Sequence, residues 1–170
     1  TGDWTYTVDD SLLPSSIASR KAFDGVVMDI NQDGWSDIYV ANDRGAEFGG
    51  NVLWWNRAGT FEAASDCGCA PVQEAMGVDI AALDHDGLLD IVTGGVIRHY
   101  LFQGLEPEIF ADMTLNLQAN PMEQFEMAWG LRFVEMDNDG STALSTASGE
   151  APHPGIATTE CTGGTALCHP

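Results

Sequence analysis

The segment DINQDGWSD, residues 29–37, carries oxygen-bearing side chains at its first, third, fifth and ninth positions. Its sixth residue is a glycine, which permits the sharp turn that brings these positions together. Such a loop can fold around one hard cation, with a backbone carbonyl offered at position seven. We predict that Asp29, Asn31, Asp33, the carbonyl of Trp35, and Asp37 bind Ca²⁺, since oxygen-only ligands suit calcium better than zinc or copper.

Two further segments repeat this pattern. They are ALDHDGLLD at residues 82–90 and EMDNDGSTA at residues 135–143. The three segments start at residues 29, 82 and 135, so both intervals are 53 residues. Even spacing of this kind indicates an internal structural repeat.

The second and third segments are imperfect copies of the first. Ala82 stands at position one of the second segment, and Ala143 stands at position nine of the third. An alternative is that Asp-Gly pairs simply make good turns. That alternative leaves the mutual repulsion of three carboxylates within the first segment unexplained. The predicted ligands of the two imperfect segments are Asp84, Asp86, the carbonyl of Leu88, Asp90, Glu135, Asp137 and Asp139.

These segments do not fit an EF-hand. An EF-hand loop needs a bidentate glutamate at position twelve, where this chain has Val40, Thr93 and Thr146. The flanks also favour strands over helices, because they are short, apolar or β-branched runs bounded by turn residues. The runs are residues 25–28, 38–40, 52–55, 76–80, 91–93, 100–102 and 129–134.

Four strands in about 50 residues is the size of one propeller blade. We therefore predict an all-β fold with about three blade-like antiparallel sheet repeats, each with an Asp-rich calcium loop. The expected repeats are residues 4–60, 61–109 and 110–150 of a domain spanning residues 1–150. A propeller needs at least about four blades, so the fold is expected to be incomplete as a closed ring.

The pattern D-x-[DN]-x-D-G-x-x-D between strands, recurring about every 50 residues, resembles the FG-GAP/VCBS repeats of integrin-α-like β-propellers. Residues 29–40, followed by residues 51–56 and 59–61, are similar to the repeat of cartilage-acidic-protein and UnbV-type secreted proteins. The resemblance covers about residues 20–150, although the FG and GAP tripeptides are absent from their usual places. It implies calcium binding in these loops and an extracellular role in adhesion or binding.

The chain ends carry two further expectations. Trp4, Tyr6 and Val8 alternate with threonines, which predicts a strand that adds to a sheet edge in this chain or in the next. Residues 151–170 are expected to form a C-terminal arm containing a disulfide hairpin. A two-residue turn would place Cys161 opposite Cys168. Cys67 and Cys69 are left with three alternatives: a tight ring, a link to the C-terminal pair, or a link between subunits.

The composition excludes several classes of protein. Acidic residues number 26 against 6 basic ones, for a formal net charge of −20, which argues against binding nucleic acid or an anionic membrane surface. No apolar run approaches the ~18 residues of a membrane span. A start at Thr1 without methionine indicates a removed leader or an excerpt of a longer chain. With four cysteines, we expect an extracellular protein whose leader has been removed.

We predict a structural or adhesive calcium-binding protein that forms a homo-oligomer or filament through open sheet edges and terminal strands. It is not expected to be an enzyme, because the clustered carboxylates are already explained by cation binding. One alternative is a lectin-like module that binds a glycan or protein, with Trp54 or Trp55 as the stacking surface. The other is a propeller fragment of a larger secreted enzyme.

Overall fold

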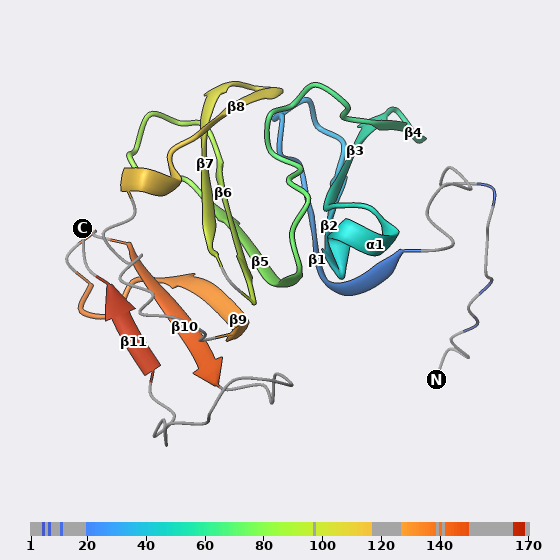
Figure 1. The fold of residues 1–170 in the computed structure, drawn as a ribbon. Coiled ribbons are helices and arrows are strands. Elements are labelled where there is room, and N and C mark those ends of the chain that lie inside the picture. Colours follow the sequence, from blue (N-terminus) through green and yellow to red (C-terminus); the bar gives the residue numbers. More distant parts are fainter. Residues whose placement is uncertain are drawn as a thin grey trace.

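The computed structural model describes residues 5, 7, 11, 20–96, 98–116, 127–138, 140, 142–149 and 165–168. Within them the protein is built from three antiparallel sheets that follow one another along the chain (Figure 1). The predicted all-β, blade-like fold is confirmed, and these sheets do not close into a ring. No helix in the described part of the chain is long and apolar enough to cross a membrane.

Sheet one and sheet two are four-stranded meanders in which consecutive strands pair. Sheet one contains β1 (Lys21–Met28), β2 (Asp37–Asp43), β3 (Val52–Arg57) and β4 (Thr60–Ala63), with the short helix α1 (Gly45–Phe48) between β2 and β3. Sheet two contains β5 (Ala75–Ala81), β6 (Asp90–Gly95), β7 (Tyr100–Glu106) and β8 (Ile109–Asp112), followed by the 3₁₀ turn η2 (Thr114–Asn116). Sheet three contains β9 (Met127–Val134), β10 (Ala143–Gly149) and β11 (Thr165–Cys168) in the order β11-β10-β9.

The first strand of each sheet carries a β-bulge at the same point of the repeat. The extra residues are Phe23 in β1, Met76 in β5 and Trp129 in β9, again 53 residues apart. A bulge increases the local twist of its strand. The three bulged strands are also those through which neighbouring sheets meet, since β5 contacts both β1 and β9. The repeat therefore extends beyond the acidic loops to the strands that join the sheets.

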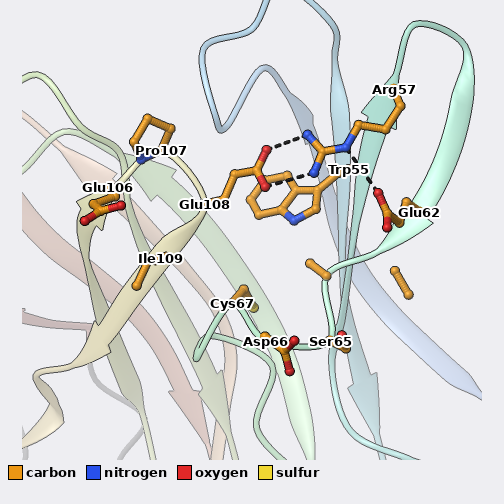
Figure 2. Close-up of a pocket in the computed structure, with 12 residues that line it drawn as sticks. Trp55, Arg57, Glu62, Ser65, Asp66, Cys67, Glu106, Pro107, Glu108 and Ile109 are labelled. Carbon is orange, nitrogen blue, oxygen red and sulfur yellow. Dashed lines mark hydrogen bonds and ion pairs between the residues drawn. The ribbon is translucent and has the colours of Figure 1, made fainter.

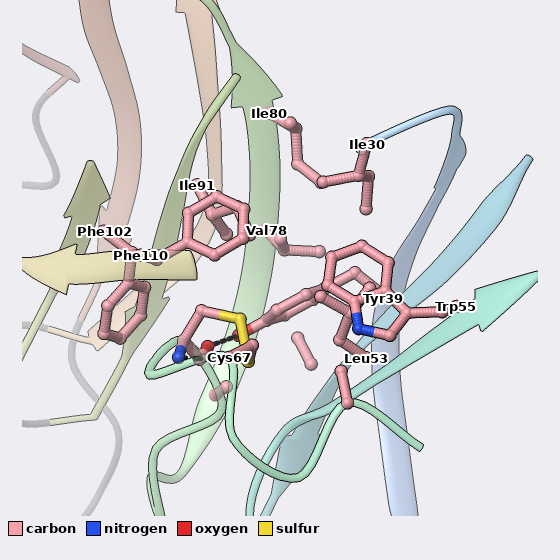
Figure 3. Packing of buried hydrophobic residues seen from close by; sticks show 14 residues of the cluster. Ile30, Tyr39, Leu53, Trp55, Cys67, Val78, Ile80, Ile91, Phe102 and Phe110 are labelled. Atoms are coloured by element: carbon pink, nitrogen blue, oxygen red, sulfur yellow. Dashed lines mark hydrogen bonds between the residues drawn. A yellow bond between two sulfur atoms is a disulfide. The ribbon is translucent and has the colours of Figure 1, made fainter. Parts of the chain in front are cut away.

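The main core lies between sheet one and sheet two (Figure 3). Tyr39 and Leu53 from sheet one and Val78 and Ile91 from sheet two are almost fully buried there. A smaller cluster joins sheet two to sheet three and contains Val92, Leu131 and Leu144. Alternation along each strand places these apolar side chains on the faces that meet.

The linker between the first two sheets, residues 64–74, runs against both of them. Its carbonyls accept backbone hydrogen bonds from Gly45 and Asn51, which lie between β2 and β3 of sheet one, and from Val96, which follows β6 of sheet two. The side chain of Gln73 is buried, and it accepts hydrogen bonds from Asn51 Nδ2 at 3.4 Å and Thr93 Oγ1 at 2.8 Å. The linker thus fixes how sheet two sits against sheet one.

Several expectations for the chain ends lie outside the described residues. These are the alternating side chains of Trp4, Tyr6 and Val8, residues 151–164, and the partner predicted for Cys168, which is Cys161. Within the C-terminal arm, only β11 is described, and it pairs antiparallel with β10. The Cys161–Cys168 bridge stays a prediction.

Candidate metal centre

The three acidic segments occupy equivalent places in the fold. Loop one (residues 29–37) connects β1 to β2, loop two (82–90) connects β5 to β6, and loop three (135–143) connects β9 to β10. Their fourth residues share the left-handed conformation, with φ of 61° at Gln32, 61° at His85 and 60° at Asn138. Their sixth residues are the glycines at 34, 87 and 140, with φ between 87° and 93°. One curled backbone is therefore used three times.

Loop one gathers its oxygens around its own amide groups. Asp29 accepts hydrogen bonds from the Asp33 amide and the Gly34 amide, both at 2.9 Å. The Asn31 Oδ1 accepts a further bond from the same Asp33 amide at 3.2 Å, and Asp33 Oδ1 accepts one from Trp35 at 2.9 Å. The side-chain oxygens of positions one and three thus converge on a single N–H group.

Asp37 anchors the base of loop one to the sheet. Its side chain is fully buried, with Oδ2 accepting the Ile30 amide at 2.9 Å and Oδ1 accepting the Asn56 amide at 2.8 Å. Burial raises the pKa of the Asp37 carboxyl, and these backbone hydrogen bonds act in the opposite direction. Asp37 therefore joins the loop to the following strands and is the least accessible of the predicted ligands in loop one.

Loop two reproduces this anchor. Asp90 is 2% exposed and accepts the Leu83 amide at 2.8 Å and the Gly104 amide at 3.0 Å. Asp84 Oδ1 accepts the Asp86 amide at 3.1 Å, and this backbone hydrogen bond is the main reason that the pKa of Asp84 is lowered. Asp86 Oδ1 accepts the amide of Leu88, whose carbonyl is the other predicted ligand, at 2.7 Å. Ala82 supplies no side-chain oxygen.

Loop three keeps the curl but has no anchoring carboxylate. Glu135 Oε1 accepts the Gly140 amide at 3.0 Å, as Asp29 does for Gly34 in loop one. Asp137 is exposed, and Asp139 lies outside the described residues. At position nine, Ala143 is buried at the start of β10.

The donor set of loop one suits a hard cation. It contains carboxylate oxygens, an amide oxygen and a carbonyl, and an oxygen that accepts one hydrogen bond retains a second lone pair. Across the described residues, no three His, Cys, Asp or Glu side chains are grouped as a metal site. A cation in loop one would therefore depend on Asn31 Oδ1 and the Trp35 carbonyl as well as on Asp29 and Asp33.

Residues 29–93, from the start of loop one into β6, match the family model of an FG-GAP-like repeat. This stretch of the chain is similar to an FG-GAP-like repeat. The resemblance predicted from the sequence is thereby confirmed for this part of the chain, while the assignment to the cartilage-acidic-protein and UnbV type stays a prediction. No curated protein matches the sequence.

Two residues that the sequence patterns did not single out, Glu108 and Gln32, connect loop one to sheet two. Glu108, in the turn between β7 and β8, accepts a hydrogen bond from Asn31 Nδ2 at 2.9 Å and forms a two-pronged ion pair with Arg57 of β3. The bond from Arg57 is the main reason that the pKa of Glu108 is lowered. Gln32 donates from Nε2 to the carbonyl of Gly87 in loop two at 2.6 Å. These contacts span 77 and 55 residues, so no local motif marks them.

A groove of about 550 Å³ opens beside this ion pair, between the β3–β4 hairpin, the linker and the β7–β8 hairpin (Figure 2). Trp55 forms part of its wall but is only 4% exposed, and Trp54 is 2% exposed. Neither indole offers a free face on which a sugar ring could stack. The observation removes the support that the sequence lent to a lectin-like site at these two residues.

Cys67 and Cys69 form a disulfide within the linker, which is the tight ring among the three alternatives. The Cys67 carbonyl accepts the Phe110 amide at 2.9 Å, and the Cys69 carbonyl accepts the Tyr39 hydroxyl at 2.7 Å. The ring therefore lies between the first two sheets and bonds to both. Both cysteines are buried in the main core, so the sulfurs serve packing and are not presented to a metal.

His99, in the turn before β7, provides a test of folding by pH. It is 6% exposed, its Nδ1 has no hydrogen-bond partner among the described residues, and burial lowers its pKa. The unfolded chain, with an ordinary histidine pKa near ~6.5, takes up a proton before the folded chain does. Stability is therefore expected to fall as pH drops below about 6.5, by up to about 1.4 kcal/mol per pH unit for this group.

Urea unfolding of wild type and His99→Gln at pH 7.5 and pH 5.5 measures this effect. The wild type should lose more stability between the two pH values than His99→Gln, because glutamine does not titrate. His85→Asn, at an exposed position of loop two, should lose as much as the wild type. Equal losses in wild type and His99→Gln would show that His99 does not contribute.

Proposed function

We propose that this protein is a calcium-stabilised structural or adhesive module that acts outside the cell and assembles with copies of itself. The proposal is based on loop one. The side chains at its positions one, three and five all offer oxygen atoms as metal ligands, and they lie on a curled backbone that recurs in loops two and three. The match to an FG-GAP-like repeat supports it, because that match begins at the first residue of loop one.

In this proposal the cation fixes the turn between the first two strands of a sheet. Asp29, Asn31 and Asp33 supply the side-chain oxygens in loop one, while Asp37 holds the loop to β3 through the Asn56 amide. Binding neutralises carboxylates that otherwise repel one another within a few residues. Ca²⁺ thereby stabilises the folded state, to which it binds, over the unfolded chain. Loop two would bind more weakly, since Ala82 removes one ligand.

Self-assembly is supported by apolar side chains on an edge strand. β1 is the first strand of sheet one and pairs only with β2 in that sheet. Along it, Val27 is 70% exposed, and Phe23, which is in ring contact with Trp129 of β9, is 50% exposed. Unpaired edges with apolar side chains are templates for pairing with another chain. With a net charge of −20, two copies repel one another, and bound calcium would reduce that repulsion.

An extracellular location is proposed on the acidic composition, the Cys67–Cys69 disulfide and the FG-GAP-like repeat. A binding role is proposed over a catalytic one, because the most conspicuous charged groups of the groove, Arg57 and Glu108, are paired with each other. Because Glu108 is held by Arg57, this part of the groove does not present it as a free carboxylate for acid–base catalysis.

Calcium is expected to raise the melting temperature of the protein. At a free concentration 100 times Kd, one site stabilises the folded state by about 2.7 kcal/mol, which is about 5–10 °C in a chain of this size. Scanning calorimetry in EGTA and in 10 mM Ca²⁺ measures the shift, and light scattering on the same samples should report a larger particle with calcium. Such modules bind calcium at roughly 10⁻⁴ to 10⁻³ M.

Asp33→Ala should remove most of the calcium shift, because it deletes a predicted ligand from the exposed end of loop one. Asp66→Ala is the matched control, since Asp66 is exposed on the linker, outside all three loops. A melting curve of the wild type that is the same in EGTA and in calcium would refute the proposal. An Asp33→Ala protein with the full shift would show that calcium binds elsewhere.

A further inference from the structure

Loop one touches sheet two at two points. Its ligand-bearing residue Asn31 donates to Glu108 at 2.9 Å, and its neighbour Gln32 donates to the carbonyl of Gly87 at 2.6 Å. Gly87 is the central glycine of loop two. The bond from Gln32 to Gly87 therefore joins the two candidate cation loops directly, and the bond from Asn31 to Glu108 links a predicted ligand of loop one to the turn between β7 and β8.

Glu108 determines which way the Asn31 amide faces. Asn31 is 5% exposed, and its Nδ2 donates both to Asp33 Oδ2 at 3.1 Å and to Glu108 Oε1 at 2.9 Å. A carboxylate accepts hydrogen bonds and donates none. The NH₂ group of Asn31 must therefore face the two carboxylates, which directs Oδ1 toward the Asp33 amide, to which Asp29 Oδ1 also bonds.

Arg57 offsets the electrostatic repulsion between Glu108 and the nearby carboxylate of Asp33. Glu108 lies near the carboxylate of Asp33, because Asn31 Nδ2 contacts both. The guanidinium of Arg57 donates to both oxygens of Glu108, with Nη2 to Oε2 at 2.8 Å, as Figure 2 shows. Two-pronged pairs of this kind add geometric specificity to charge neutralisation. Arg57 belongs to sheet one and Glu108 to sheet two, so the pair also spans the two sheets.

We propose that loops one and two bind their cations as a coupled pair, with Glu108 as the positioning residue for Asn31 and Gln32 as the link between the loops. This inference rests on the proposed calcium function and adds a regulation to it. A cation that orders loop one also orders the contacts that hold loop two. By linkage, a cation in loop two must favour loop one by the same factor.

Terbium luminescence on the full chain tests the coupling. Tb³⁺ is a hard cation with a preference for oxygen ligands, and Trp35 lies within loop one and is 48% exposed. Its indole should sensitise a bound Tb³⁺, and loss of that signal in Trp35→Phe assigns it to loop one. Asp86→Asn weakens loop two without touching loop one. We expect it to raise the Tb³⁺ midpoint of loop one at least about five-fold, the lower end of ordinary coupling.

Two variants test the contacts themselves. Gln32→Asn tolerates the left-handed backbone but is one methylene shorter, so it should break the link to Gly87 and raise the midpoint by a similar factor. Glu108→Ala should weaken loop one, and Glu108→Gln should recover part of the affinity because it keeps an oxygen for Asn31. Glu106→Ala, on the same hairpin but away from both contacts, should match the wild type.

A readout on the metal-free protein separates positioning from general stability. In EGTA, the side-chain NH₂ resonances of Asn31 should move in Glu108→Ala and stay in place in Glu106→Ala. Coupling is overturned if Asp86→Asn and Gln32→Asn both leave the loop-one midpoint within two-fold of wild type. A wild-type chain that gives no Trp35-sensitised signal would instead overturn the calcium function itself. If Glu108→Ala does not fold, Glu108→Gln still tests the positioning of Asn31, and Gln32→Asn still tests the coupling of the two loops.

Discussion

Replacing Asp37 by alanine should lower the free energy of unfolding by about 3–5 kcal/mol, even in the absence of calcium. The side chain is fully buried and accepts the amides of Ile30 and Asn56 at 2.9 and 2.8 Å. Alanine leaves those amides without their partner, and each unsatisfied buried donor costs about 1–3 kcal/mol. The change also removes one of the hydrogen bonds between loop one and β3, leaving the bond from Asn56 Nδ2 to the Ser36 carbonyl.

Urea unfolding in EGTA measures this cost without any contribution from a bound cation. Asp33→Ala is the matched control, because Asp33 belongs to the same loop but is exposed and accepts a hydrogen bond at the loop's outer end. It should cost less than about 1 kcal/mol in EGTA. Asp90→Ala should behave like Asp37→Ala, because Asp90 holds Leu83 and Gly104 in the same way. Equal losses for Asp37→Ala and Asp33→Ala would contradict the anchoring role.

The anchoring aspartate at position nine is one reason that the repeat can be recognised in the sequence, because the same role requires the same residue type at the same position. Position nine of loops one and two is aspartate, and the glycine at position six recurs in all three loops with φ near 90°. These requirements act on residues within one loop, so spacing alone reveals them. The β-branched runs beside the loops likewise predicted strands, and the structure confirms them: residues 38–40 lie within β2 and residues 91–93 within β6.

Features of the same repeat with no fixed residue type were not predicted. The bulges at Phe23, Met76 and Trp129 share the period of 53. The three residues are of different types. A bulge depends on how two strands twist and pair, and it does not require a particular side chain. Ring contact between Phe23 and Trp129, at 6.3 Å between centroids, similarly joins strands more than 100 residues apart. The packing of whole sheets decides such positions.

In the candidate site, too, the residues within one loop could be predicted from the sequence, whereas those brought together by the packing of sheets could not. Spacing predicted Asp29, Asn31, Asp33 and the turn at Gly34, because they lie within nine residues. Glu108 could not be found this way, since it reaches Asn31 only when sheet two is placed against sheet one. The different tasks of equivalent aspartates were also hidden: burial separates Asp37, which anchors, from Asp33, which stays exposed. Residue type alone does not distinguish them.

The second large effect concerns the linker that places sheet two. Gly45, the first residue of α1, donates its amide to the carbonyl of Gln73 at 3.1 Å. A Cβ at position 45 would lie 2.2 Å from that carbonyl oxygen and 2.8 Å from the Gln73 nitrogen. Both are backbone atoms and cannot rotate away. Gly45→Ala must therefore push the linker off sheet one, and we expect a loss of about 3 kcal/mol, at the upper end of overpacking effects.

Gly130→Ala is the same substitution where the space is open, since a Cβ there meets no atom within 4 Å. It should be neutral or stabilising by up to about 1 kcal/mol, because alanine reduces the entropy of the unfolded chain. The linker also carries Gln73, which bonds to Asn51 of sheet one and to Thr93 of sheet two. Gly45→Ala should therefore speed hydrogen exchange at Val96, whose amide bonds to the linker carbonyl of Glu74. A Gly45→Ala protein as stable as Gly130→Ala would mean that the linker does not hold the two sheets together.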